Sequence, residues 1–104
     1  MTITVEFHGP IAIIILLGGI DYSSQEELRN AIDSAMSAEG VREVQVNLAQ
    51  IAFMDSSAIR TLILFQKQAA SNGKSLVLLD CNDNMRQVFE IGGFDKMFTF
   101  RTSR

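Results

Sequence analysis

The sequence predicts a single α/β domain over residues 1–104, with a mixed and mostly parallel sheet, the element order β-β-α-β-α-β-α-β and helices mainly on one face. Three observations support this fold class. The 104 residues suffice for one hydrophobic core and are too few for two. Hydrophobic residues make up 47% and charged residues 20% of the chain, a globular rather than a disordered composition. Strand-like runs alternate with segments of helical spacing, which favours parallel strands joined by right-handed crossovers.

Two strands are expected at the start of the chain. Apolar residues alternate in the segment Thr2 to Phe7, and His8-Gly9-Pro10 then forms a turn. The run Ile11 to Leu17 is apolar at every position, which indicates a central strand buried on both sides, and Gly18-Gly19 ends it. The first strand is therefore expected to run antiparallel to the second.

A helix and a third strand follow. Ser24 and Glu27 have the spacing of a capping box, and apolar residues recur at helical spacing from Ser24 to Ala38, before Gly40 stops the helix. In the next strand Val44, Val46 and Leu48 alternate with Glu43, Gln45 and Asn47. This alternation predicts one dry face and one wetter face, so helices are expected to cover only one side of the sheet there.

The rest of the chain predicts two more helix and strand pairs. A helix with a broad apolar stripe begins at the serine pair and ends near Asn72-Gly73, and Leu76 to Leu79 forms a buried strand. Asp83 is the expected cap of a third helix, which Gly92-Gly93 stops. Met97 to Phe100 then forms a short last strand.

Composition excludes several function classes. Nine Lys and Arg against twelve Asp and Glu give a net charge of -3, and the basic residues are scattered, so nucleic acid is not an expected partner. The longest apolar run is far shorter than the roughly 20 residues that span a bilayer, and no leader opens the chain. We therefore expect a cytoplasmic protein without direct membrane insertion. The lone Cys81 cannot form an internal disulfide.

Three motifs partly match known catalytic or ligand-binding motifs, but the surrounding sequence lacks the elements or residues that such sites require. Gly73-Lys74-Ser75 leads from a helix into a strand, whereas a phosphate-binding loop leads from a strand into a helix. The segment Asp80 to Ile91 lacks the glycine and the final acid of a calcium loop. His8 is the sole candidate base for a serine triad, but no nucleophile elbow accompanies it. We expect no catalytic residue, no metal and no cofactor.

The segment FMDSSAIR, Phe53 to Arg60, carries the main functional question. Asp55 has the chemistry of an N-cap, which makes Ser56 the first and Ser57 the second residue of a helix. A cap alone would explain Asp55. A hydroxyl in the first helical turn is also well placed for phosphorylation, because free N–H groups and the helix dipole favour an added anion by roughly 0.3–1 kcal/mol. The spacing is compatible with both interpretations.

Three ordered motifs resemble those of the sulfate-transporter and anti-sigma-antagonist (STAS) domains. IAFMDSSAIRTLI is similar to the D-S-S signature of bacterial anti-sigma factor antagonists, LLGGIDYSS to the G-x-L-D turn, and GKSLVLLDCNDNMRQVFEIGGFDKMFTF to the late strand, helix and last strand. The resemblance implies a non-enzymatic STAS domain in which Ser57 is phosphorylated by a serine-protein kinase that is also an anti-sigma factor. A metal-dependent serine phosphatase would reverse the modification. Asp21, Asp55, Ser56 and Arg60 would form the kinase-binding surface.

Departures from the family pattern lead to further expectations. Ala58 replaces the usual glycine, and Arg60 replaces a small residue on the same helical face as Ser57, where it could pair with a phosphate. The chain ends at Arg104, without the C-terminal helix of many relatives, which leaves weak homodimerisation open. At most two of Phe53, Met54, Phe94 and Met97 are expected to be exposed as an apolar docking patch. The alternative function is a STAS accessory subunit of a membrane lipid-transport complex, without a phosphorylation switch.

Overall fold

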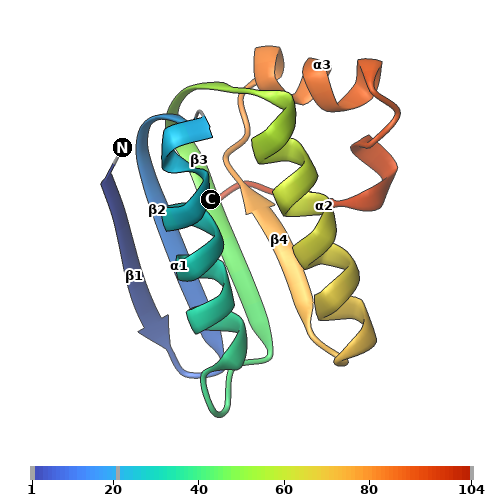
Figure 1. Cartoon of the computed structure of the whole chain (residues 1–104). Coiled ribbons are helices and arrows are strands. Elements are labelled where there is room, and N and C mark those ends of the chain that lie inside the picture. Colours follow the sequence, from blue (N-terminus) through green and yellow to red (C-terminus); the bar gives the residue numbers. More distant parts are fainter. Residues whose placement is uncertain (1, 21, 104) are drawn as a thin grey trace.

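The computed structural model of the chain describes residues 2–20 and 22–103, which form a five-stranded sheet with three α-helices (Figure 1). The elements follow the predicted order: β1 (Thr2–His8), β2 (Ile11–Ile20), α1 (Gln25–Ser37), β3 (Glu43–Met54), α2 (Ser56–Ser71), β4 (Ser75–Leu79), α3 (Asp83–Ile91) and β5 (Thr99–Arg101), with short 3-10 turns η1 (Tyr22–Ser24) and η2 (Asp95–Met97). None of the helices in the described ranges is both long and apolar enough to cross a membrane.

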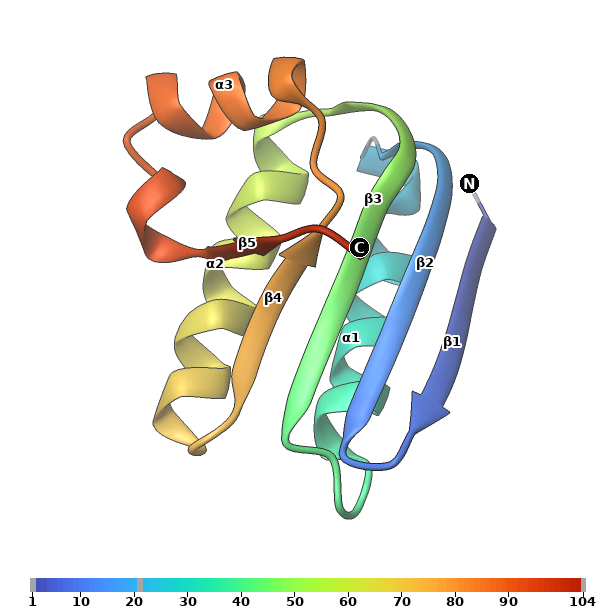
Figure 2. The same cartoon turned by 180° about the vertical axis from the view of Figure 1, so that it is seen from behind.

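The order of the strands in space explains where the helices lie. The sheet has the order β1-β2-β3-β4-β5, with β1 antiparallel to β2 and all later neighbours parallel. Right-handed crossovers that always step in the same direction return on the same side of a sheet. Helices α1 and α2 accordingly lie in front of the sheet in Figure 1 and behind it in Figure 2, while α3 lies beyond the carboxyl end of β4.

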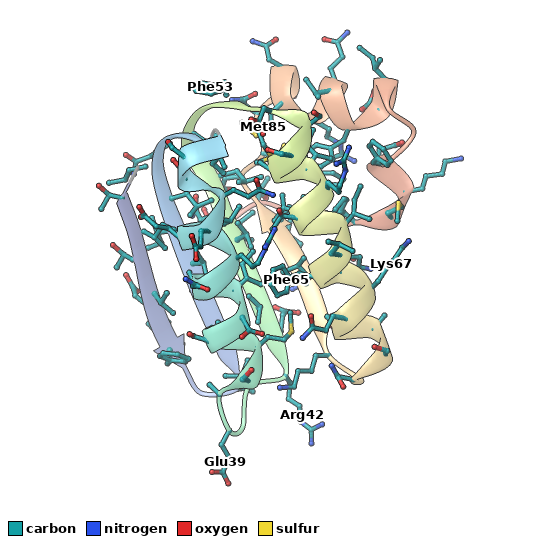
Figure 3. The ribbon with its side chains drawn as sticks, in the orientation of Figure 1. Glu39, Arg42, Phe53, Phe65, Lys67 and Met85 are labelled. Atoms are coloured by element: carbon teal, nitrogen blue, oxygen red, sulfur yellow. The ribbon has the colours of Figure 1, made fainter. Side chains whose placement is uncertain are left out.

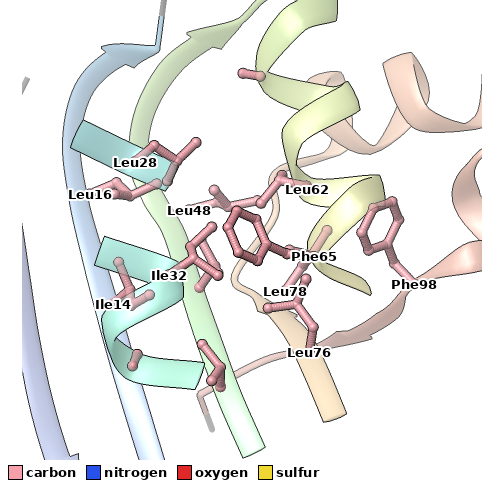
Figure 4. Packing of buried hydrophobic residues seen from close by; sticks show 14 of the residues in the cluster. Ile14, Leu16, Leu28, Ile32, Leu48, Leu62, Phe65, Leu76, Leu78 and Phe98 are labelled. Atoms are coloured by element: carbon pink, nitrogen blue, oxygen red, sulfur yellow. The ribbon is translucent and has the colours of Figure 1, made fainter. Parts of the chain in front are cut away.

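The main core fills the space between these helices and the sheet (Figure 4). Large side chains with no exposed surface come from every layer: Ile14 and Leu16 of β2, Leu28 and Ile32 of α1, Leu48 of β3, Leu62 of α2 and Leu78 of β4. An aromatic cluster beside this core holds α3. Phe89 is fully buried, and its ring centroid lies 5.3 Å from that of Phe98 and 5.6 Å from that of Phe100, both edge to face.

The prediction that β2 is buried on both sides is wrong. Ala12, Ile14 and Leu16 are fully buried, but the alternate residues Ile13 and Ile15 are half-buried. These alternate residues point to the face that carries no helix. Because the sequential strand order places α1 and α2 on one side, a strand can be apolar throughout and still have an open face.

Four predicted element ends and caps also need correction. Strand β2 continues through Gly18-Gly19 to Ile20, because β3 offers it partners as far as Met54. Ser24 makes no side-chain capping bond to α1. It is the last residue of η1, and its backbone is already helical, with φ −93° and ψ −8°. The cap of α3 is Asn82 rather than Asp83, with Asn82 Oδ1 accepting from Met85 N at 2.8 Å. Residue Met97 belongs to η2, and β5 begins at Thr99.

Candidate functional site

The junction between β3 and α2 lies at the carboxyl edge of the parallel strands. Met54 ends β3 and is in register with Ile20 at the end of β2. Asp55 follows, and its backbone N–H donates to Ile20 O at 3.4 Å. The end of β2 therefore lies directly beside the start of α2. Asp21, the predicted neighbour of the phosphorylation site, lies outside the described residues, so its predicted role remains a prediction.

Asp55 is the N-cap of α2, as its chemistry predicts. Its backbone is extended, with φ −85° and ψ 175°, and Ser56 is the first helical residue. One carboxylate oxygen, Oδ1, accepts two hydrogen bonds: from Ala58 N at 2.9 Å and from Ser57 Oγ at 2.7 Å. The same oxygen therefore stabilises the helix start and fixes the direction of the Ser57 hydroxyl.

A chain of hydrogen bonds connects Ser57 to helix α1. Ser57 is half-buried, and its carbonyl oxygen accepts from Thr61 Oγ1 at 3.0 Å. Thr61 is buried, and its hydroxyl in turn accepts from Gln25 Nε2 at 3.1 Å. The first turn of α2 is thus tied to the first residue of α1, which lies next to the turn that follows β2.

Sequence reasoning did not identify Gln25 or Thr61. A signal was present, because Thr61 is a polar residue within the apolar stripe of α2, between Ile59 and Leu62. Its partner lies 36 residues earlier in the chain, so no local pattern links the two. Only the packing of α1 against α2 brings the amide and the hydroxyl together.

Ser56 and Arg60 lie on the outer side of the same helical turn, and both are exposed. Together with Ile59, Ile63 and Phe94 they line a hollow of about 300 Å³. Arg60 forms no salt bridge with any residue that the structure describes. Its position three residues after Ser57 places the two side chains on neighbouring positions of the helix surface.

The apolar patch predicted around the serines has one exposed member. Phe53 is 53% exposed, whereas Met54, Phe94 and Met97 are half-buried, which confirms the expectation of at most two exposed residues. Phe53 lies at the same end of the molecule as Met85, where β3 ends and α3 begins (Figure 3). An exposed aromatic side chain therefore stands close to the serine pair.

The three partly matching motifs have structural roles. Lys74 donates to the carbonyl of Met36, which ties the end of α2 to that of α1. Asn82 is a helix cap, and no group of three potential metal ligands occurs among residues 2–20 and 22–103. His8 is exposed and contacts Glu6 Oε1 at 3.0 Å. It lies at the amino end of β2, roughly 30 Å of strand away from the edge that carries Ser57, so the two cannot form a catalytic pair.

Comparison with known proteins gives this fold a family context. Residues 2–104 match the model of the STAS domain. BtrV of Bordetella bronchiseptica is 29% identical over 104 residues, which cover all of this chain and 89% of that protein. The anti-sigma-B factor antagonist of Staphylococcus aureus is 30% identical over 76 residues, which cover 73% of this chain and 69% of the relative.

Solved structures show the same fold. The anti-sigma factor antagonist SpoIIAA in its unphosphorylated form has a TM-score of 0.77 at 22% identity, over 99% of this chain and 89% of that one. Bacillus SpoIIAA in the phosphorylated form has a TM-score of 0.76 at 23% identity, over 98% of this chain and 93% of that one. The β-β-α-β-α-β-α-β order is thus that of a known architecture.

Proposed function

The chain belongs to the STAS domain family, among the anti-sigma factor antagonists, and from this premise we propose that it is a regulatory phosphoprotein of a partner-switching pathway. Members of this group are non-enzymatic regulators. The unphosphorylated form binds a serine-protein kinase that also acts as an anti-sigma factor, and phosphorylation of Ser57 releases it. A metal-dependent serine phosphatase restores the binding form, and both events take place in the cytoplasm.

The hydrogen bond from Ser57 Oγ to Asp55 Oδ1 carries this proposal. A phosphate on Ser57 removes the hydroxyl proton that this bond needs, and it adds about −1.5 to −2 charges beside a carboxylate. The attractive contact of 2.7 Å is thereby replaced by repulsion. A kinase surface matched to the neutral Ser57 hydroxyl beside the Asp55 carboxylate would meet both the new charge and the cost of desolvating it.

The same position allows the fold to survive the modification. Ser57 lies in the first turn of α2, where free N–H groups and the helix dipole favour an anion by roughly 0.3–1 kcal/mol. SpoIIAA has been solved in unphosphorylated and phosphorylated forms, and this chain has a similar fold to both. A switch of this kind therefore changes a surface and leaves the core unchanged.

Arg60 is the residue expected to moderate the switch. It lies three residues after Ser57 on the helix and has no salt-bridge partner among the described residues. Pairing with the phosphate would reduce the repulsion that the kinase meets. Arg60→Ala should then weaken the residual affinity of the phosphorylated protein for its kinase. The control is Lys67→Ala, which removes an exposed cation farther along α2 and should leave that affinity unchanged. An unchanged affinity in Arg60→Ala removes this role.

The proposal is tested by labelling with the cognate kinase and ATP. One phosphate should be added to the native protein, none to Ser57→Ala, and one to the matched control Ser56→Ala, whose hydroxyl is exposed. Labelling that persists in Ser57→Ala but vanishes in Ser56→Ala contradicts the assignment.

A binding experiment separates this function from that of an accessory transport subunit. Capture of a soluble serine kinase, with the affinity lost in Ser57→Asp, supports the switch. Capture of a transporter ATPase with the same affinity for the native protein and for Ser57→Asp contradicts it.

A further inference from the structure

A groove lies immediately beside the serine pair, between the end of β3 and the start of α3. It encloses about 210 Å³ and is lined by Phe53, Met54, Ile59, Asn82, Asn84, Met85 and Val88. None of these residues carries a charge. The volume exceeds the roughly 150 Å³ of an apolar cavity that can hold benzene, so one aromatic or branched aliphatic side chain fits.

The outer wall of the groove is the Phe53 ring, which lies against Gly19 of β2. A Cβ atom built on Gly19 would lie 2.0 Å from Phe53 Cε1, so the aromatic ring occupies the space that any side chain at position 19 would need. Phe53 nevertheless remains 53% exposed. The ring is therefore packed against the backbone of β2 on one side and open to a partner on the other.

The opposite wall belongs to the first two turns of α3. Asn82 Oδ1 caps this helix by accepting from Met85 N, and Met85 is buried at the base. Val88 is 46% exposed and lies four residues after Asn84, so both face the same side of the helix. The groove thus has apolar walls and two side-chain amides, those of Asn82 and Asn84. Such a lining suits an uncharged side chain of a partner whose backbone can hydrogen-bond to these amides.

The groove is continuous with the Ser57 surface. Met54 and Ile59, which line it, are the residues on either side of the segment 55–58 that contains the cap and the hydroxyl. A stable protein interface covers about 800 Å² on each partner. An interface of that size centred on Ser57 is large enough to extend over the neighbouring groove.

We infer that this groove receives one apolar side chain of the serine kinase that binds and phosphorylates Ser57, an inference that rests on the proposed function. The inserted side chain supplies affinity, because a buried apolar anchor in a preformed pocket dominates the energetics of many interfaces. It also makes the interface sensitive to phosphate. An apolar contact is stable only when water is excluded from it. A doubly charged phosphate beside the contact either brings its hydration water into the interface or pays the free-energy cost of losing that water, and both weaken binding.

Two substitutions on α3 provide the test. Val88→Gln places a polar amide in the groove, whereas Ile91→Gln makes the same kind of change at a residue that is 81% exposed and does not line it. With the kinase isolated by its ATP-dependent labelling of Ser57, Val88→Gln should raise both Kd and KM by about tenfold or more and leave kcat unchanged. Ile91→Gln should remain within about twofold of the native protein. Phe53→Ala, which removes the other wall, should follow Val88→Gln.

The outcomes separate the groove from the switch. If Ser57 is phosphorylated and Val88→Gln behaves like Ile91→Gln, the groove does not receive the kinase and this inference is overturned alone. If the native protein receives no phosphate at Ser57, the proposed function and the inference are overturned together. Weaker binding in Val88→Gln and Phe53→Ala, with the thermal midpoint of Val88→Gln unchanged, supports the groove as part of the kinase interface.

Discussion

The double hydrogen bond of Asp55 gives a prediction that needs no partner protein. In Asp55→Ala the N–H of Ala58 loses its acceptor, and the loss of such a cap costs about 1 kcal/mol, within a range of roughly 0.5–2. The Ser57 hydroxyl also loses its acceptor, but Ser57 is half-buried and water can replace the carboxylate, so this second loss adds little. We therefore expect the free energy of unfolding to fall by about 1–2 kcal/mol. The corresponding fall in Tm is roughly 4–8 °C per kcal/mol.

Asp55→Asn separates the cap from the charge. Asparagine caps helices about as well as aspartate, and its side-chain oxygen can accept from the same N–H, so its stability should lie within about 0.5 kcal/mol of the native value. Asp33→Ala, at an exposed position in α1, is the control for loss of one carboxylate. Urea unfolding followed by far-ultraviolet circular dichroism measures all four proteins. Equal stability of Asp55→Ala and the native protein, or equal losses in Asp55→Ala and Asp55→Asn, would refute the capping role.

Two further predictions concern residues around the site. Burial raises the pKa of the Cys81 thiol to about 11 from an ordinary value of 9.0, with the charge of Arg86 opposing the shift. Alkylation of the folded protein at pH 8 should then be roughly 100-fold slower than that of the urea-unfolded chain, and equal rates would contradict this. Since the raised pKa belongs to the folded state, the contribution of this thiol to stability is complete below pH 9 and is lost as the pH rises towards 11. Gly19→Ala should destabilise by about 1–3 kcal/mol through its clash with the Phe53 ring, and Phe53→Ala should restore most of that loss. Additive losses in the double variant, measured by urea unfolding, would show that the two residues do not contact each other.

The sequence by itself determined the elements of this fold and the local geometry of the serine pair. Alternating and helical apolar spacing depend on neighbours within one strand or one to two helical turns, so the order of strands and helices could be predicted from local patterns. The same holds for Asp55 as a cap, because its contacts with Ser57 and Ala58 span two and three residues. The expected capping box at Ser24 failed where a 3-10 turn, which the spacing does not reveal, preceded the helix.

Only the tertiary structure decided which surfaces are open and which distant residues meet the site. The sequential strand order left one face of β2 uncovered, although Ile13 and Ile15 suggested burial on both sides. The bond between Gln25 and Thr61 and the groove beside Phe53 depend on how separate elements pack, across 36 residues in the first case. The physical reason is that a local pattern specifies which face of an element is apolar, whereas the partner of that face is chosen by competition among all the elements of the folded chain.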